Sequence, residues 1–103
     1  MRMMVRFSFP NEEGNEGLRN GKVLKVFGMI MEELKPEAVY LYPEGGQRGG
    51  IMVFDMQRPE QVAEVGERFW FGLGADVEMT PVMTGEDLQK AMPVVEGIAK
   101  RYS

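Results

Sequence analysis

The chain has 103 residues, a length that suits one hydrophobic core, so we expect a single domain over residues 1–103. It contains no cysteine and no histidine, which excludes disulfides and removes the commonest general base and metal ligand at neutral pH. A net charge of −4, with both signs spread along the chain, disfavours nucleic-acid binding, and no apolar run reaches the length of a membrane span. These features predict a cytoplasmic protein that uses no metal and no cofactor.

The first predicted element is a β-strand over residues 3–9. Apolar side chains recur there with the period of a strand that has one buried face, and the predicted buried set is Met3, Val5, Phe7 and Phe9. Residues 11–21 are polar and contain three glycines, so we expect a loop that runs into a helix. From Val23 the apolar residues recur at three- and four-residue spacings, which predicts a helix that ends at Pro36.

Two further strands are predicted on either side of a glycine-rich loop. Residues 38–42 and 51–56 are rich in aromatic, β-branched and other apolar residues. Residues 43–50 separate them and contain four glycines, which predicts a loop. Because this connection is short, the two strands are expected to pair as an antiparallel hairpin.

A second helix and a fourth strand follow. Pro59 opens the helix at a first-turn position, and Gly72 and Gly74 end it. Within the helix, Gly66 is expected to allow a close approach to the sheet. Residues 75–82 alternate as the fourth strand.

The chain ends in a predicted third helix with its own start signal. Thr84 is a good N-cap, and Asp87 stands three residues later, which is the spacing of a capping box. Pro93 is expected to break or kink this helix near Met92, because proline lacks the N–H that the helix needs.

The element order β-α-β-β-α-β-α predicts an α+β fold: a ferredoxin-like βαββαβ sandwich with an additional C-terminal helix. Two helices would cover one face of a four-stranded antiparallel sheet. The second face would be either solvated or half-buried against another subunit. We favour burial against a subunit, because a domain this small gains from extra buried surface.

Alternation within the predicted strands places five candidate ligand-binding residues on this second face: Arg6, Tyr40, Tyr42, Asp55 and Glu78. An arginine and a tyrosine there could hold a carboxylate or an enolate. A carboxylate desolvated beside methionine could act as a base next to a carbonyl. The simpler alternative is an ordinary cross-strand ion pair between Arg6 and Glu78 at an interface.

Three successive aromatic residues, Phe69, Trp70 and Phe71, belong to the second helix. They cannot all face the core, because successive residues of a helix point in different directions. Phe69 suits the core, whereas Trp70 or Phe71 either fills the helix end or reaches a partner or a pocket. Trp70 is therefore the sixth candidate ligand-binding residue.

Motifs for nucleotides and RNA are incomplete in this chain. Residues 44–50 are glycine-rich but precede a strand, whereas a phosphate-binding loop ends in Gly-Lys-Ser/Thr and opens a helix. Residues 48–55 partly match an RNA-recognition signature, but Gly50 and Met52 stand where that signature needs stacking aromatics. We expect no nucleic-acid partner.

The element order, and the pairing of strand 3–9 with segment 77–82, resemble the dimeric α+β-barrel superfamily. The runs RGGIMVFDM at 48–56 and TPVMTGEDL at 80–88 resemble more specifically a group of small uncharacterised bacterial members. This resemblance implies a homodimer that joins through the sheet face. The superfamily includes muconolactone isomerases, cofactor-independent monooxygenases, dye-decolourising and haem-degrading enzymes and ligand binders. Its haem-binding members use a histidine that this chain lacks, and no other active-site motif maps onto the sequence.

The leading functional hypothesis is a dimeric module that binds a small organic molecule in a cavity at the sheet face. A second hypothesis is a cofactor-independent isomerase or monooxygenase-like enzyme that acts on small organic acids through Arg6, a tyrosine and a carboxylate. A third is a purely structural dimerisation module. The enzyme hypothesis predicts a concave pocket on the sheet face, and the sequence leaves open whether the chain is catalytic.

Overall fold

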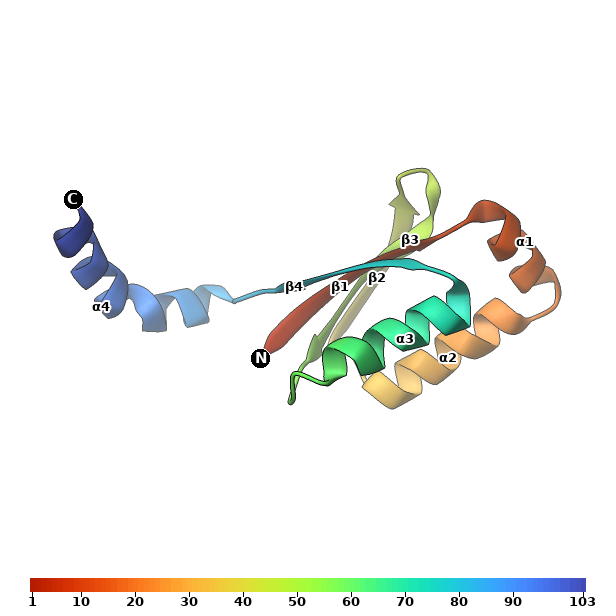
Figure 1. Ribbon diagram of the computed structural model, residues 1–103, viewed down its shortest axis with the longest axis horizontal. Helices are drawn as coiled ribbons and strands as arrows, with labels where there is room; N and C mark the ends of the chain where they lie inside the picture. The colour runs from red at the N-terminus through yellow and green to blue at the C-terminus, as the bar shows by residue number, and fades with distance from the viewer.

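Four strands and four helices make up the fold in the computed structural model, which describes all 103 residues. In chain order they are β1 (Arg2–Phe9), α1 (Asn11–Arg19), α2 (Lys22–Leu34), β2 (Ala38–Glu44), β3 (Gln47–Asp55), α3 (Gln61–Leu73), β4 (Asp76–Pro81) and α4 (Gly85–Tyr102). The strands form one antiparallel sheet in the order β2-β3-β1-β4. Helices α2 and α3 lie across one face of it (Figure 1). The predicted α+β, ferredoxin-like fold is confirmed.

β1 is a central strand, and its alternation decides which face of the sheet is covered. The side chains buried against the helices are the predicted ones: Met3, Val5, Phe7 and Phe9. The ring of Phe7 packs on Phe69 of α3 and on Phe27 of α2, with centroids 4.9 and 6.2 Å apart. Since a fully buried side chain of this size contributes about 1.5–3 kcal/mol, this aromatic cluster is a main link between the helices and the sheet.

The segment predicted as a loop running into a helix, residues 11–21, instead holds a separate nine-residue helix, α1. Its glycines are packing positions. A β-carbon on Gly17 would lie 2.5 Å from a methyl group of Val23, and one on Gly14 would lie 3.1 Å from the ring of Phe9. In the sequence these glycines favoured a loop, whereas in the structure they allow α1 to approach its neighbours closely.

The predicted eight-residue loop at 43–50 is also wrong, because β2 and β3 continue almost to the tip of the hairpin. The turn contains only Gly45 and Gly46, whose φ angles of 59° and 83° are both positive, as a tight hairpin turn requires. Gly49 and Gly50 lie inside β3 and are buried. A β-carbon on Gly50 would collide with the carbonyl oxygen of Tyr40 on β2.

In α3 the C-terminal stop is confirmed at Gly74, which has a φ of 60° and caps the helix. Gly72 lies within the helix, and its missing side chain makes room for Val26 of α2. Gly66 was expected to face the sheet. Its neighbour is the indole ring of Trp70, one helical turn later, which would lie 2.8 Å from a β-carbon at this position.

α4 begins as predicted, with a complete capping box. The Thr84 amide donates to Asp87 Oδ2 at 2.9 Å, and the Asp87 amide donates to Thr84 Oγ1 at 3.1 Å. Pro93 lies inside the helix and does not break it, and the ribbon curves along its length (Figure 1).

The whole of α4 projects away from the sheet and the other helices (Figure 1). None of its residues is buried. The radius of gyration is 17.2 Å, whereas a compact chain of this length would have about 13 Å. The sequence predicted this helix but not that it would pack against none of the other elements. None of the four helices has the length and apolar character that crossing a membrane would require.

The close approach of β2 to β3 generates a prediction about two glycines. Gly50→Ala should lower the free energy of unfolding by about 2 kcal/mol or more, because the new methyl group forces the edge strand β2 away from β3. Gly28→Ala is the control, since no atom lies within 4 Å of its added carbon and alanine favours the helix, so its stability should be equal or slightly higher. Urea denaturation measures both, and equal stability of the two variants would contradict this packing.

Candidate functional site

The candidate site lies on the outer face of the sheet, the face that points away from α2 and α3. The strand register places Tyr40, Ile51, Arg6 and Glu78 in one row across all four strands. Tyr42 stands in the next row, two residues further along β2. The structure therefore brings four of the six candidate residues together, as the alternation predicted.

Contacts within this group are polar and exposed. Arg6 Nη1 lies 3.6 Å from Glu78 Oε2. The Glu78 side chain is 75% exposed, so this pair is a surface ion pair of small energetic value. A hydrogen bond with Glu44 and burial raise the pKa of Tyr42 above its ordinary value, and the positive charge of Arg6 opposes this shift.

Glu44 is a member of this group that the sequence analysis missed. The predicted second strand ended at Tyr42 because of Pro43, whereas β2 continues to Glu44. A period of two places residues 40, 42 and 44 on one face, so a longer strand would have revealed it. Pro43 is tolerated because β2 is an edge strand.

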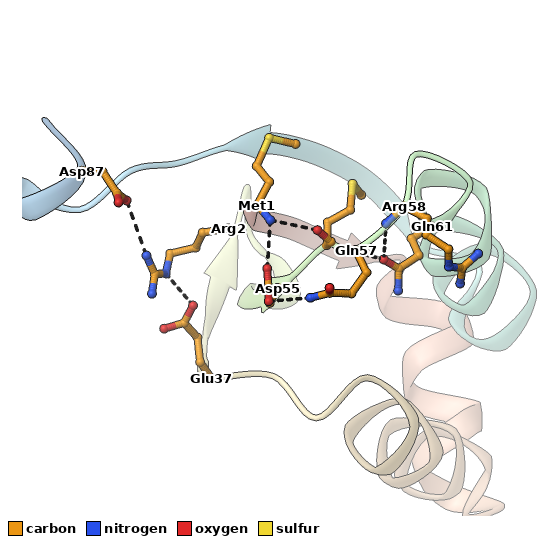
Figure 2. Close-up of polar contacts among 9 residues, drawn as sticks. Met1, Arg2, Glu37, Asp55, Gln57, Arg58, Gln61 and Asp87 are labelled. Carbon is orange, nitrogen blue, oxygen red and sulfur yellow. Dashed lines mark hydrogen bonds and ion pairs between the residues drawn. The ribbon is translucent and has the colours of Figure 1, made fainter. Parts of the chain in front are cut away.

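Asp55 shares the outer face but lies at the opposite end of β3. Its register partner is Arg2, four residues along β1 from Arg6, which corresponds to about 13 Å. The N-terminal amine of Met1 donates to Asp55 Oδ1 at 2.9 Å, and Gln57 donates to its other oxygen (Figure 2). The hydrogen bond from the N-terminal amine, together with its positive charge, lowers the pKa of Asp55. Asp55 thus holds the chain's own terminus and does not join the other candidates.

Arg2 connects three elements at this same end of the sheet (Figure 2). Its Nε lies 2.6 Å from Glu37 Oε1, just before β2, and its Nη1 lies 3.6 Å from Asp87 Oδ2 in the first turn of α4. The amide and hydroxyl of Thr84 lower the pKa of Asp87. Together the capping box and Arg2 fix the point from which α4 leaves the sheet.

Trp70 does not join the outer-face group, because α3 covers the opposite face of the sheet. Its ring rests over Gly66 and is about half exposed. Phe69 is fully buried, as expected, whereas Phe71 is the most exposed of the three aromatics.

One pocket of the chain lies away from the outer face. A pocket of about 780 Å³ opens on the helix side, between α1, the start of α2 and the β2–β3 hairpin. Tyr42 is the only candidate residue that borders it. The cavity expected at the sheet face would therefore have to form between two chains.

The chemistry available on the outer face of a single chain is binding. Arg6 and the phenol of Tyr42 can hold an anionic oxygen. A carboxylate base for abstracting a proton next to a carbonyl needs desolvation, and Glu78 is largely exposed. No group of three or more acidic side chains is close enough to hold a metal ion.

The two neighbours of Tyr42 generate a prediction with opposite signs. Glu44→Gln should lower the pKa of Tyr42 towards the ordinary phenol value of about 10, because a neutral amide no longer disfavours the phenolate. Arg6→Gln should raise the pKa, because it removes a positive charge. Ultraviolet titration of tyrosinate measures both, with Tyr42→Phe to assign the signal. Shifts of the same sign in the two variants would contradict the arrangement.

Asp87 generates a prediction of pH dependence. Its lowered pKa means that the folded helix favours the carboxylate, so the capping contribution is present above pH 4 and is lost as the pH falls through the folded-state value. The helical signal of α4 should decline in acid, and Asp87→Asn should make that decline smaller. Amide NMR signals of α4 between pH 6 and pH 2 measure it. Glu86→Gln is the control, because Glu86 lies one residue earlier and outside the capping box, and α4 of this variant should lose its helical signal in acid as the wild type does. An equal decline of the helical signal in the two variants would refute the role of Asp87.

A comparison with curated proteins finds no match for this chain. The model of one protein family, described as "Domain of unknown function (DUF3303)", matches residues 1–96. The matched segment contains every strand, the first three helices and most of α4. The chain therefore belongs to the DUF3303 family, whose function is unknown.

Proposed function

We propose that the protein is a homodimer that joins through the outer face of the sheet and through α4, and that this dimer binds a small organic molecule between its two sheets. The observation that carries the proposal is the detachment of α4. This helix has 18 residues and buries none of them.

α4 carries an apolar stripe that needs a partner. The stripe recurs at three- and four-residue spacings and consists of Leu88, Ala91, Met92, Val95, Ala99 and Tyr102. An isolated helix of this length is only marginally stable in water, and most helical stability in proteins comes from packing such a stripe. The stripe is the first of two uncovered surfaces.

The outer face of the sheet is the second. Met4, Ile51 and Val53 lie there among the polar side chains and are only partly buried. A sheet covered on one side only, in a domain of this size, gains stability when its other side is also buried.

A second copy of the chain can cover both surfaces at once, because its outer face can bind the stripe of α4 and its α4 can bind the outer face. α4 points away from its own sheet, and the contacts at its start hold it there (Figure 1). It is about 27 Å long, whereas four strands span about 14 Å between the outer strand axes, so α4 is long enough to cross the sheet of another chain. Two-fold symmetry lets each chain donate one helix and receive one.

Charge also suits this exchange. Lys100 and Arg101 stand at the end of α4, while Asp76 and Glu78 lie on the outer face of β4. The resemblance to the dimeric α+β-barrel superfamily points to the same kind of assembly. The molecule bound between the sheets would meet Arg6, Tyr40 and Tyr42, a set that suits a small organic acid.

The assembly is tested by native mass spectrometry of the freshly purified protein. We expect a mass twice the 11.7 kDa of one chain, and a small molecule that survives purification would appear as additional mass. Val95→Glu in the stripe and Ile51→Lys on the outer face should each give monomers, because both bury a charge at the interface.

Matched controls separate this effect from a general effect of charge. Gln89→Glu adds the same charge to α4 outside the apolar stripe, and Met29→Lys adds a lysine to an exposed position of α2, on the helix side. Both should remain dimers. A monomeric wild-type protein would refute the dimer, and monomeric control variants would refute the assignment of these two surfaces.

A further inference from the structure

The pocket of about 780 Å³ on the helix side has the dimensions and the lining of a small-molecule site. Its floor is apolar and comes from Phe7 and Phe9 of β1, and Phe27 of α2 lines its wall. The pocket belongs to a single chain and lies on the opposite side of the sheet from the proposed dimer interface, so it goes beyond the function proposed above.

The pocket exists because the helices do not reach the outer end of β2. Leu41 points to the helix side, in register with Gly50, yet it is 64% exposed. Leu24 lines the pocket from α2 and is 69% exposed. Gly50 has no side chain to fill the space between Leu41 and Phe7, its two register partners. Two large apolar side chains are thus left uncovered inside a concave surface, which is where a ligand would bury them.

Arg48 supplies the charge at this pocket. It lies on the helix side of β3, where its register partners are Phe9 and Pro43. A carboxylate lies within ion-pair distance of five other arginines, which are Arg2, Arg6, Arg19, Arg58 and Arg68. Arg48 and Arg101 have no such partner, and of these two only Arg48 lines the pocket.

The Arg48 side chain is exposed, and its guanidinium lies beside α1. A β-carbon added to Gly14 would lie 3.0 Å from Nη1 of Arg48 and 3.1 Å from the ring of Phe9. The guanidinium therefore lies near Gly14 of α1 and the aromatic floor of the pocket. Asn11 donates to the carbonyl of Gly46 at 3.4 Å and ties α1 to the hairpin turn, while the amides of Asn15 and Gln47 also line the pocket.

We infer that this pocket binds an organic monoanion, a carboxylate on an apolar body, with Arg48 holding the carboxylate and the phenylalanine and leucine side chains covering the body. A guanidinium matches a carboxylate with two parallel hydrogen bonds. A single positive charge balances one negative charge, and the net charge of −4 disfavours a dianion such as a phosphate monoester.

The test is an NMR titration of the protein with 2-naphthoate, compared with the uncharged 2-naphthamide and with 2-naphthyl phosphate. We expect amide shifts confined to α1, the start of α2 and the β2–β3 hairpin, and weaker binding of the amide and the phosphate. Arg48→Gln should weaken naphthoate binding by about tenfold or more, because it removes a charge-assisted hydrogen bond. Arg19→Gln, on α1 but outside the pocket lining, should bind like the wild type.

Two further variants make the result decisive. Leu41→Glu places a negative charge in the pocket at an exposed position and should also abolish naphthoate binding. The dimer-interface variant Ile51→Lys should still bind naphthoate, which keeps this test independent of the proposed function. No shifts at millimolar naphthoate, shifts on the outer face, or equal affinity of Arg48→Gln and wild type would each overturn the inference.

Discussion

The arrangement of this molecule depends on one constraint: a single layer of helices can cover only one face of a sheet. The sequence of β1 follows this constraint: every second residue is apolar and buried, and the residues between them are not buried. The buried half of the strand meets the rings of α2 and α3, and this contact forms the core. Everything of functional interest lies where that coverage stops, either on the outer face or beyond the ends of the helices.

The two proposed binding regions exist because the helices leave two parts of the sheet uncovered. The outer face has no helix at all from its own chain, and the proposed dimer would cover it with a second copy. The pocket lies on the covered face, between the start of α2, α1 and the β2–β3 hairpin. Both regions meet at the β2–β3 hairpin, where Tyr42 stands on one side of β2 and Leu41 on the other. A ligand in the pocket and a partner on the outer face would therefore contact opposite sides of the same edge strand.

The element order, the buried face of β1 and the capping box at Thr84 could be predicted because each depends on local pattern. The role of the glycines could not. Gly17, Gly49 and Gly72 have the same sequence signature as loop glycines, yet they mark close contacts with neighbouring elements, α2 for Gly17 and Gly72 and β1 for Gly49. Four outer-face candidates were found by alternation alone. Asp55 shares their face but not their end of the sheet, and Trp70 lies on the helix side, because alternation and helical spacing specify a face but not a position along the strand or the side of the sheet that a helix covers. Arg48 belongs to the glycine-rich segment, to the partial RNA-recognition signature and to the run 48–56, but none of these patterns predicted its role, since its isolation from carboxylates appears only in three dimensions.

Pro93 has a consequence for the shape of α4. Proline removes one helical hydrogen bond and its ring displaces the carbonyl of Gln89, so the helix opens on the side where Pro93 stands. By helical spacing, that side is roughly opposite Leu88 and Val95. The apolar stripe therefore lies along the inner side of the bend. A helix that is concave on its apolar side fits a convex surface better than a flat one, and the twist of an antiparallel sheet provides such a surface. The residue that weakens α4 as a free helix is thus also the residue that gives it the curvature to wrap.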